Sequence, residues 1–224
     1  MLRALLFDID GTLAETDTLH YKIWCQVLQE QGLEIDNAFY KEKISGRLNP
    51  DIVQDLLPQL SPEQQAAFIE HKESTFREQA ALEPLDGLLD LLEWARQQQL
   101  PCAVVSNAPK ENAKFMLKAL DVEAAFPTVI LGGELPIGKP DPLPYQEALR
   151  QLNLLATETI AFEDSPSGIQ SATGAGIPVV GIASTHEPQG LKELGAAIVV
   201  KDFADPLLMQ WLQQRLDCHA FAAV

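Results

Sequence analysis

Leu5-Leu6-Phe7-Asp8-Ile9-Asp10-Gly11-Thr12 is the stretch that decides the fold of this 224-residue chain. Its first three residues are apolar, as in a strand that is buried on both faces of a parallel sheet. Two carboxylates then follow within three residues, and Gly11 permits a sharp turn directly after the strand. The stretch therefore predicts a buried parallel strand with a polar site at its carboxyl end.

Short apolar runs recur along the rest of the chain, and helical segments separate them. The predicted strands cover residues 4–7, 102–105, 128–131, 159–162, 179–182 and 197–200. The predicted helices cover residues 85–99, 110–120, 142–152, 167–175, 188–194 and 205–215. Because strand and helix alternate, we predict an α/β fold, a doubly wound parallel sheet with helices on both faces.

The region from residue 16 to residue 83 interrupts this alternation, because it shows helical patterning and no convincing strand. Segment 17–31 repeats apolar residues on one helical face, and Gly32 suits its C-terminal end. Ser61-Pro62-Glu63-Gln64 is typical of a helix start, with a capping Ser and Pro at the first helical position. We therefore predict an inserted all-helical cap domain at 16–83 and an α/β core domain formed by 1–15 and 84–224.

The composition excludes several classes of partner. The chain has a formal net charge of −16 and scattered Lys and Arg residues, so we expect no binding to nucleic acid or to a membrane. The first apolar run stops at Asp8, which is too early for a signal peptide or a membrane span. Cys25, Cys102 and Cys218 fit neither a disulfide framework nor a zinc site and indicate a reducing compartment. We expect a cytoplasmic monomer.

Polar side chains lie at the ends of the predicted strands, the edge where open α/β sheets bind ligands. They are Asp8 and Asp10, Ser106 and Asn107, Lys139 in the loop after the third strand, and Glu163 and Asp164. Clustered carboxylates repel one another unless a cation relieves them, and their oxygens suit Mg²⁺. Any one of these residues could merely cap a helix or a turn. Caps have no reason to collect several acids, a Ser and a Lys, so the set predicts a phosphoryl-transfer site that contains Mg²⁺.

Four motifs, each after the expected strand, resemble those of the haloacid dehalogenase-like (HAD) phosphatase superfamily. They are Asp8-Ile9-Asp10-Gly11-Thr12-Leu13, Ser106-Asn107, Lys139-Pro140 and Glu163-Asp164-Ser165-Pro166-Ser167-Gly168. The resemblance covers essentially the whole chain, and a helical cap between the first and second motifs agrees with it. It implies the Rossmann-like core of that superfamily and Mg²⁺ as the cofactor.

The resemblance also implies a role for each motif. Asp8 would attack phosphorus and form an aspartyl-phosphate. Asp10 would act as general acid and then as base, which requires a raised pKa that neighbouring carboxylates encourage. Ser106 and Asn107 would donate hydrogen bonds to the phosphoryl group, and Lys139 would balance its charge. The implied magnesium ligands are Asp8, the backbone carbonyl of Asp10, and Asp164. Glu163 would either bind the ion directly or contact one of its ligands.

Residues of the cap resemble the β-phosphoglucomutase-like branch of the superfamily. His20 stands where that branch has a His that hydrogen-bonds the general acid. Ser45-Gly46-Arg47 resembles its substrate loop, in which a basic residue meets a distal phosphate or sugar oxygens, and Arg77 resembles a further basic contact. The predicted substrate-binding residues are Asn107, His20, Gly46, Arg47 and Arg77.

These features favour a Mg²⁺-dependent phosphatase that hydrolyses a small phosphorylated metabolite, a sugar phosphate. Thr12 supports hydrolysis, since mutases of the resembling branch often carry a small apolar residue at that place. Two alternatives stay open. One is a hexose-phosphate mutase of the β-phosphoglucomutase type, which His20, Arg47 and Arg77 favour, and the other is a non-catalytic binding protein with the HAD fold.

Overall fold

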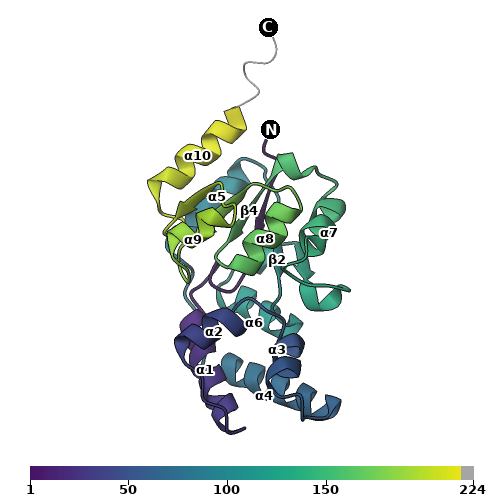
Figure 1. Ribbon diagram of the computed structural model, residues 1–224. Helices are drawn as coiled ribbons and strands as arrows, with labels where there is room; N and C mark the ends of the chain where they lie inside the picture. The colour runs from purple at the N-terminus through teal and green to yellow at the C-terminus, as the bar shows by residue number, and fades with distance from the viewer. Residues whose placement is uncertain (218–224) are drawn as a thin grey trace.

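A six-stranded parallel sheet forms the centre of the computed structural model, which describes residues 1–217 (Figure 1). The strands are β1 (Ala4–Phe7), β2 (Cys102–Ser106), β3 (Thr128–Leu131), β4 (Thr159–Glu163), β5 (Val179–Ile182) and β6 (Ile198–Val200). Their order is β3-β2-β1-β4-β5-β6, and each neighbouring pair is parallel. The predicted doubly wound α/β fold is confirmed.

Strand β1 lies inside the sheet, as its apolar sequence predicts. All four of its residues are buried, and Leu5 lies opposite Cys102 on one neighbour and Ile160 on the other. The strand order runs one way from β1 through β2 to β3, and the other way from β4 to β6. The direction therefore reverses between β1 and β4, and a crevice opens at such a switch point beside the carboxyl ends of the strands. Asp8 follows β1 at this crevice.

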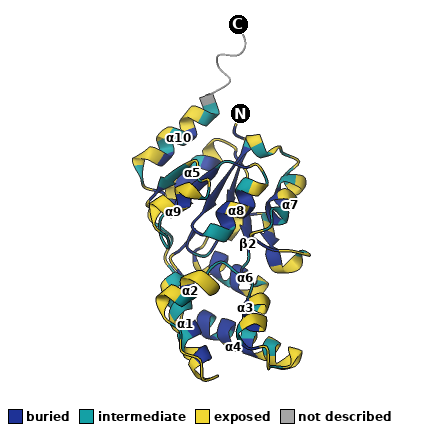
Figure 2. Ribbon diagram, viewed as in Figure 1, coloured by how far each residue is buried: buried dark blue, intermediate teal, exposed yellow. Residues whose placement is uncertain are grey.

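Alternate side chains of β1 enter two separate cores, because successive residues of a strand point to opposite faces. Leu5 and Phe7 belong to the core under α5 (Leu88–Gln97), α6 (Lys110–Ala119) and α10 (Pro206–Asp217). Leu6 belongs to the core under α7 (Leu143–Leu152), α8 (Pro166–Gly174) and α9 (Pro188–Glu193). Figure 2 shows the sheet buried between these two layers of helices.

Short 3-10 turns lie in the connections around β3 and before β4. They are η1 (Glu123–Ala125), η2 (Gly132–Glu134) and η3 (Ala156–Glu158).

The predicted elements differ from the observed ones only at their ends. Ser106 and Glu163 are the last residues of β2 and β4 instead of following them. The helix predicted at 85–99 is shorter because Gly87 and Gln99 adopt left-handed backbone conformations at its two ends.

The predicted helical insertion consists of α1 (Asp17–Gln29), α2 (Asn37–Lys43), α3 (Asn49–Leu56) and α4 (Pro62–Gln79). These helices form a separate layer beyond α6, at the lower end of the molecule in Figure 1. Helix α4 begins with the predicted capping box of Ser61 and Gln64. Two connecting segments join this layer to the core, and the Leu85 N–H donates to the Leu13 carbonyl at 2.9 Å between them. The domain limits 16 and 83 remain a prediction.

Two further sequence expectations concern cysteines and membranes. Cys25 and Cys102 are free thiols, and burial raises the pKa of Cys102 to about 12; Cys218 lies outside the described residues. Among residues 1–217, no helix combines the length and the apolar composition that crossing a bilayer requires.

We expect Gly87→Ala to destabilise the fold much more than Gly32→Ala. Both glycines have left-handed backbones, with φ of 80° and 78°. A side chain at Gly87 would also clash with the backbone of Phe203 and Ala204, whereas nothing lies within 4 Å at Gly32. The expected losses in the free energy of unfolding are about 3 kcal/mol or more for Gly87→Ala and about 1 kcal/mol for Gly32→Ala, measured by urea denaturation. Equal losses would contradict the close packing of this turn.

Candidate active site

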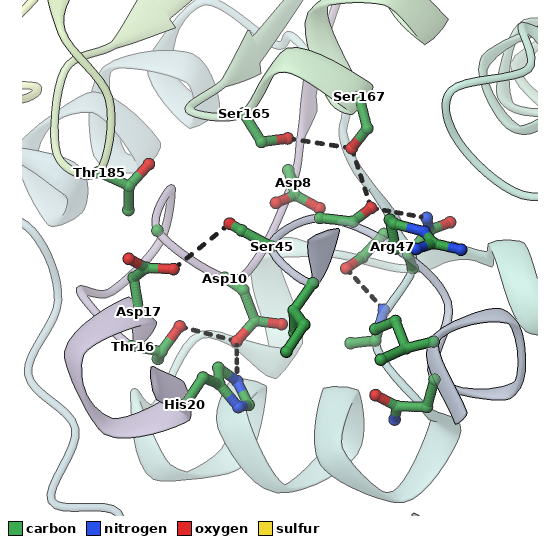
Figure 3. A pocket seen from close by; sticks show the side chains of 18 of the residues that line it. Asp8, Asp10, Thr16, Asp17, His20, Ser45, Arg47, Ser165, Ser167 and Thr185 are labelled. Carbon is green, nitrogen blue, oxygen red and sulfur yellow. Dashed lines mark hydrogen bonds and ion pairs between the residues drawn. The ribbon is translucent and has the colours of Figure 1, made fainter. Parts of the chain in front are cut away.

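A cavity lies between the carboxyl ends of the strands and the cap helices (Figure 3), with about 100 Å³ accessible to the centre of a water molecule. It gathers most of the predicted site residues. The core contributes Asp8, Asp10, Ser106, Asn107, Lys139 and Asp164, and the cap contributes His20, Gly46 and Arg47. Glu163 lies beneath the cavity floor, fully buried, and Arg77 does not line the cavity.

The buried ammonium group of Lys139 joins two carboxylates. Its Nζ atom lies 2.8 Å from Asp8 Oδ1 and 2.5 Å from Glu163 Oε1. Tyr145, on α7, donates its hydroxyl to the same Glu163 oxygen at 2.5 Å. Burial alone would lower the pKa of Lys139, but the charges of Asp8 and Glu163 outweigh it and raise the pKa. Lys139 is therefore a cation fixed beside Asp8.

Asp8, Glu163 and Asp164 form a buried acidic cluster, with one oxygen of each within 4.8 Å of the others. Burial raises the pKa of all three, that of Glu163 to about 7, and the charge of Asp8 raises the other two further. Such repulsion is relieved when a cation binds.

The surroundings of the cluster fit Mg²⁺. Glu163 Oε2 is buried and accepts no hydrogen bond from the described residues. A side chain at Gly11 would clash with the Asp164 carboxylate, and one at Gly168 would clash with that of Glu163. The two glycines therefore leave space for these carboxylates. Three hard oxygen ligands in a close group are the donor set that Mg²⁺ accepts.

The Asp10 carboxylate faces away from this cluster, towards the cap. Thr16 donates its hydroxyl to Asp10 Oδ1 at 2.8 Å, and His20 Nε2 lies 3.0 Å from the same oxygen (Figure 3). Lys72 Nζ lies 3.0 Å from the other ring nitrogen of His20, Nδ1. An ammonium group can only donate, so Nδ1 accepts and the His20 proton lies on Nε2, directed at Asp10. Phe76 stacks on the imidazole, with centroids 4.2 Å apart and an interplanar angle of 6°.

The expected raised pKa of Asp10 is wrong for this arrangement. Burial does act to raise the pKa, but the hydrogen bonds from His20 and Thr16 and the nearby charge of Lys72 outweigh it. The net pKa lies below the ordinary value of 3.8. Neighbouring carboxylates alone would raise the pKa of Asp10. The hydrogen-bond donors Thr16 and His20 lower it, and their contact with Asp10 depends on the tertiary structure.

Lys72 and Glu73 form a second buried ion pair, which the sequence analysis missed. Lys72 Nζ lies 2.7 Å from Glu73 Oε1, and both side chains are about 3% exposed. A signal was present, since Lys72 lies midway between Phe68 and Phe76 at helical spacing. A charged residue on the apolar face of a helix indicates a buried partner.

Arg77 reaches the cavity only through Asn112. Its guanidinium donates to Asn112 Oδ1 at 2.6 Å and pairs with Glu70 at 2.5 Å. The amide nitrogen of Asn112, a residue that lines the cavity, donates to Glu73 Oε2. Arg77 therefore sets which end of the Asn112 amide faces Glu73, and it lies behind the cavity wall.

The Gly46 carbonyl connects the cap to the core. It accepts hydrogen bonds from Asn107 Nδ2 at 3.2 Å and from Ser167 Oγ at 2.9 Å. Asn107 Nδ2 also donates to the Lys139 carbonyl at 3.0 Å, so one amide contacts both the cap and the loop that carries the cation. Arg47, the next residue, pairs with Asp55 at 2.6 Å. The cap is thus closed on the core in this structure.

Comparison with known proteins agrees with this geometry. The family model described as haloacid dehalogenase-like hydrolase matches residues 5–182. The chain is 29% identical over 215 residues to the validoxylamine A 7'-phosphate phosphatase of Streptomyces hygroscopicus subsp. limoneus, covering 92% of this chain and 96% of that protein. It is 28% identical over 207 residues to the phosphorylated carbohydrates phosphatase of Thermotoga maritima, covering 89% and 94% respectively.

A solved structure shows the same fold. The crystal structure of a HAD hydrolase, family IA, variant 3, from Entamoeba histolytica HM-1:IMSS superposes with a TM-score of 0.85 at 25% identity, covering 96% of this chain and all of that one. Residues 5–182, which the family model matches, contain all four motifs. The residues of these motifs meet at the carboxyl end of the sheet. This chain belongs to the haloacid dehalogenase-like hydrolase family.

Proposed function

We propose that this hydrolase is a Mg²⁺-dependent phosphatase that releases phosphate from a small phosphorylated sugar through an aspartyl-phosphate on Asp8. The contact that carries the proposal is the 2.8 Å approach of the buried Lys139 ammonium to Asp8. A nucleophilic carboxylate needs a fixed cation to receive a phosphate dianion, and the contact supplies one. The relative named phosphorylated carbohydrates phosphatase supports the substrate class, and the one named validoxylamine A 7'-phosphate phosphatase supports hydrolysis of a phosphate ester.

The core residues divide the work of the first step. Asp8 attacks phosphorus, and the bond to the leaving oxygen breaks as the aspartyl-phosphate forms. Lys139 stabilises the negative charge on the transferring group, and Ser106 donates a hydrogen bond to its oxygens. Asn107 would donate to the same oxygens by releasing its contact with the Gly46 carbonyl. Mg²⁺ held by Asp8, Asp164, the Asp10 carbonyl and Glu163, directly or through water, would withdraw charge from the phosphoryl oxygens.

Asp10 and His20 handle the protons. A phosphate dianion that enters beside Asp10 raises its pKa by repulsion, so the carboxyl can take up a proton and pass it to the leaving alkoxide. In the second step the resulting carboxylate accepts a proton from the water that attacks the aspartyl-phosphate. His20 keeps the carboxyl of Asp10 in position through both steps.

The remaining proposals concern the cap and the partners. We propose that residues 16–83 act as the cap that admits substrate, with His20, Gly46 and Arg47 on its inner side. The partner is a small phosphorylated metabolite, with neither nucleic acid nor a membrane involved. We expect the protein to be a monomer in the cytoplasm.

Phosphate release from a panel of glucose 6-phosphate, fructose 6-phosphate, glycerol 3-phosphate and phosphoglycolate tests the phosphatase proposal. With Mg²⁺ we expect release from at least one sugar phosphate, and loss of more than about 10³-fold in kcat for Asp8→Asn, because the nucleophile is removed. The exposed Asp90→Asn is the matched control and should be unaffected. If β-glucose 1-phosphate were isomerised without net phosphate release, the mutase alternative would replace this proposal.

Removing divalent cations with a chelator should abolish phosphate release, and Mg²⁺ should restore it. Calorimetry should detect Mg²⁺ binding to the wild type and at least tenfold weaker binding to Asp164→Asn, because the cluster loses one charged ligand. Full activity in the chelator would contradict the metal requirement.

His20→Ala should lower kcat by about 10²-fold and leave Mg²⁺ binding unchanged, because His20 contacts Asp10 and none of the cluster residues. The variant loses the donor that lowers the pKa of Asp10, while the burial that raises the pKa remains. Because Asp10 must be protonated when the alkoxide leaves, the basic limb of the kcat/KM profile should therefore move to higher pH. His71→Ala, an exposed His on α4, is the control, and the same shift in both variants would refute the role of His20.

A further inference from the structure

Every cationic side chain at the cap end of the cavity is already paired with a carboxylate. The cations that line this end are Arg47 and Lys72. Arg47 lies 2.6 Å from Asp55, and Lys72 lies 2.7 Å from Glu73. Lys139, the third cation of the lining, lies at the Asp8 end and is held by Asp8 and Glu163. A second anionic group on the substrate would therefore meet no unpaired cation among the described residues of this lining.

Glu73 neutralises Lys72 at this end of the cavity, whose wall also contains Asn49 and Asn112. Its side chain is about 3% exposed, and its oxygens accept hydrogen bonds from Lys72, from Asn49 at 2.5 Å and from Asn112. These donors come from α3, α4 and α6, so the carboxylate is held from the cap and the core together. A carboxylate so fixed can accept a further hydrogen bond from a hydroxyl group, and its pairing with Lys72 leaves that ammonium no free charge to offer a second anion.

Asn49 and Asn112 complete the wall with neutral amides. The amide nitrogen of each donates to Glu73, and the Asn112 oxygen accepts from Arg77. The wall thus consists of amides, a carboxylate and cations already in ion pairs. Such groups suit the hydroxyls of a polyol, since each hydroxyl can both donate and accept.

We propose that the substrate is a neutral polyol esterified by a single phosphate, and that Glu73, by neutralising Lys72, is the specificity-determining residue that disfavours substrates whose leaving group carries a carboxylate or a second phosphate. The inference rests on the proposed phosphatase function and narrows its substrate class. Selection acts here because a second anionic group would lose its water and find no unpaired cation among the described residues of the lining, while a neutral polyol finds hydrogen-bonding partners.

Matched pairs of phosphate esters test the inference. Glucose 6-phosphate is compared with 6-phosphogluconate, fructose 6-phosphate with fructose 1,6-bisphosphate, and glycerol 3-phosphate with 3-phosphoglycerate. In each pair that is hydrolysed, the wild type should show kcat/KM at least about tenfold higher for the neutral member. This measurement needs no variant, and an equal or higher value for the anionic members would overturn the inference while the phosphatase function stood.

Glu73→Gln should reduce that preference about tenfold, because it removes the charge and keeps the shape. Glu78→Gln, an exposed residue on the same helix, should leave the preference unchanged. Calorimetric binding of both members to the Asp8→Asn variant, with and without Glu73→Gln, should show the same change in the affinity ratio without turnover. An equal change in the Glu73 and Glu78 variants would overturn the role of Glu73. No release from any ester would instead overturn the phosphatase proposal and this inference together.

Discussion

The buried contact between Lys139 and its two carboxylates is the constraint on which the rest of this structure depends. Asp8 comes from the end of β1, Glu163 from the end of β4, and Lys139 from the loop between β3 and α7. One ammonium group therefore ties three distant segments together at the carboxyl edge of the sheet. Removing one partner of such a group typically costs about 3–5 kcal/mol, because a buried charge is left alone. The same contact that organises the edge also places a cation beside Asp8, the proposed nucleophile.

A second buried pair organises the cap in a similar way. Lys72 holds the imidazole of His20, which in turn faces Asp10, and Glu73 neutralises Lys72. The carboxylate of Asp10, the proposed acid–base residue, thus receives its hydrogen bonds from side chains at the cap, and these lower its pKa. The Gly46 carbonyl, which accepts from Asn107 and Ser167, joins the cap to the core beside the cavity.

The errors of prediction have physical causes. The strands were predictable because burial on both faces leaves short apolar runs, and the helix ends moved by a few residues because left-handed positions such as Gly87 stop a helix. The raised pKa expected for Asp10 was wrong, since Thr16 and His20 direct donors at it. Arg77 resembled a substrate contact but lies behind Asn112. A resemblance in sequence places a residue near a site without showing where its side chain is directed.

The sequence by itself determined the parallel sheet, the inserted helices and the membership of the core motifs in one site. It could do so because strand periodicity, capping residues and the carboxyl edge of a sheet follow from local chemistry. Only the tertiary structure decided that Asp10 leaves the acidic cluster, that His20 carries its proton on Nε2, and that Glu73 stands in the cavity wall. Those outcomes depend on direct contacts between side chains of separate segments of the chain. A local sequence pattern does not determine such long-range contacts.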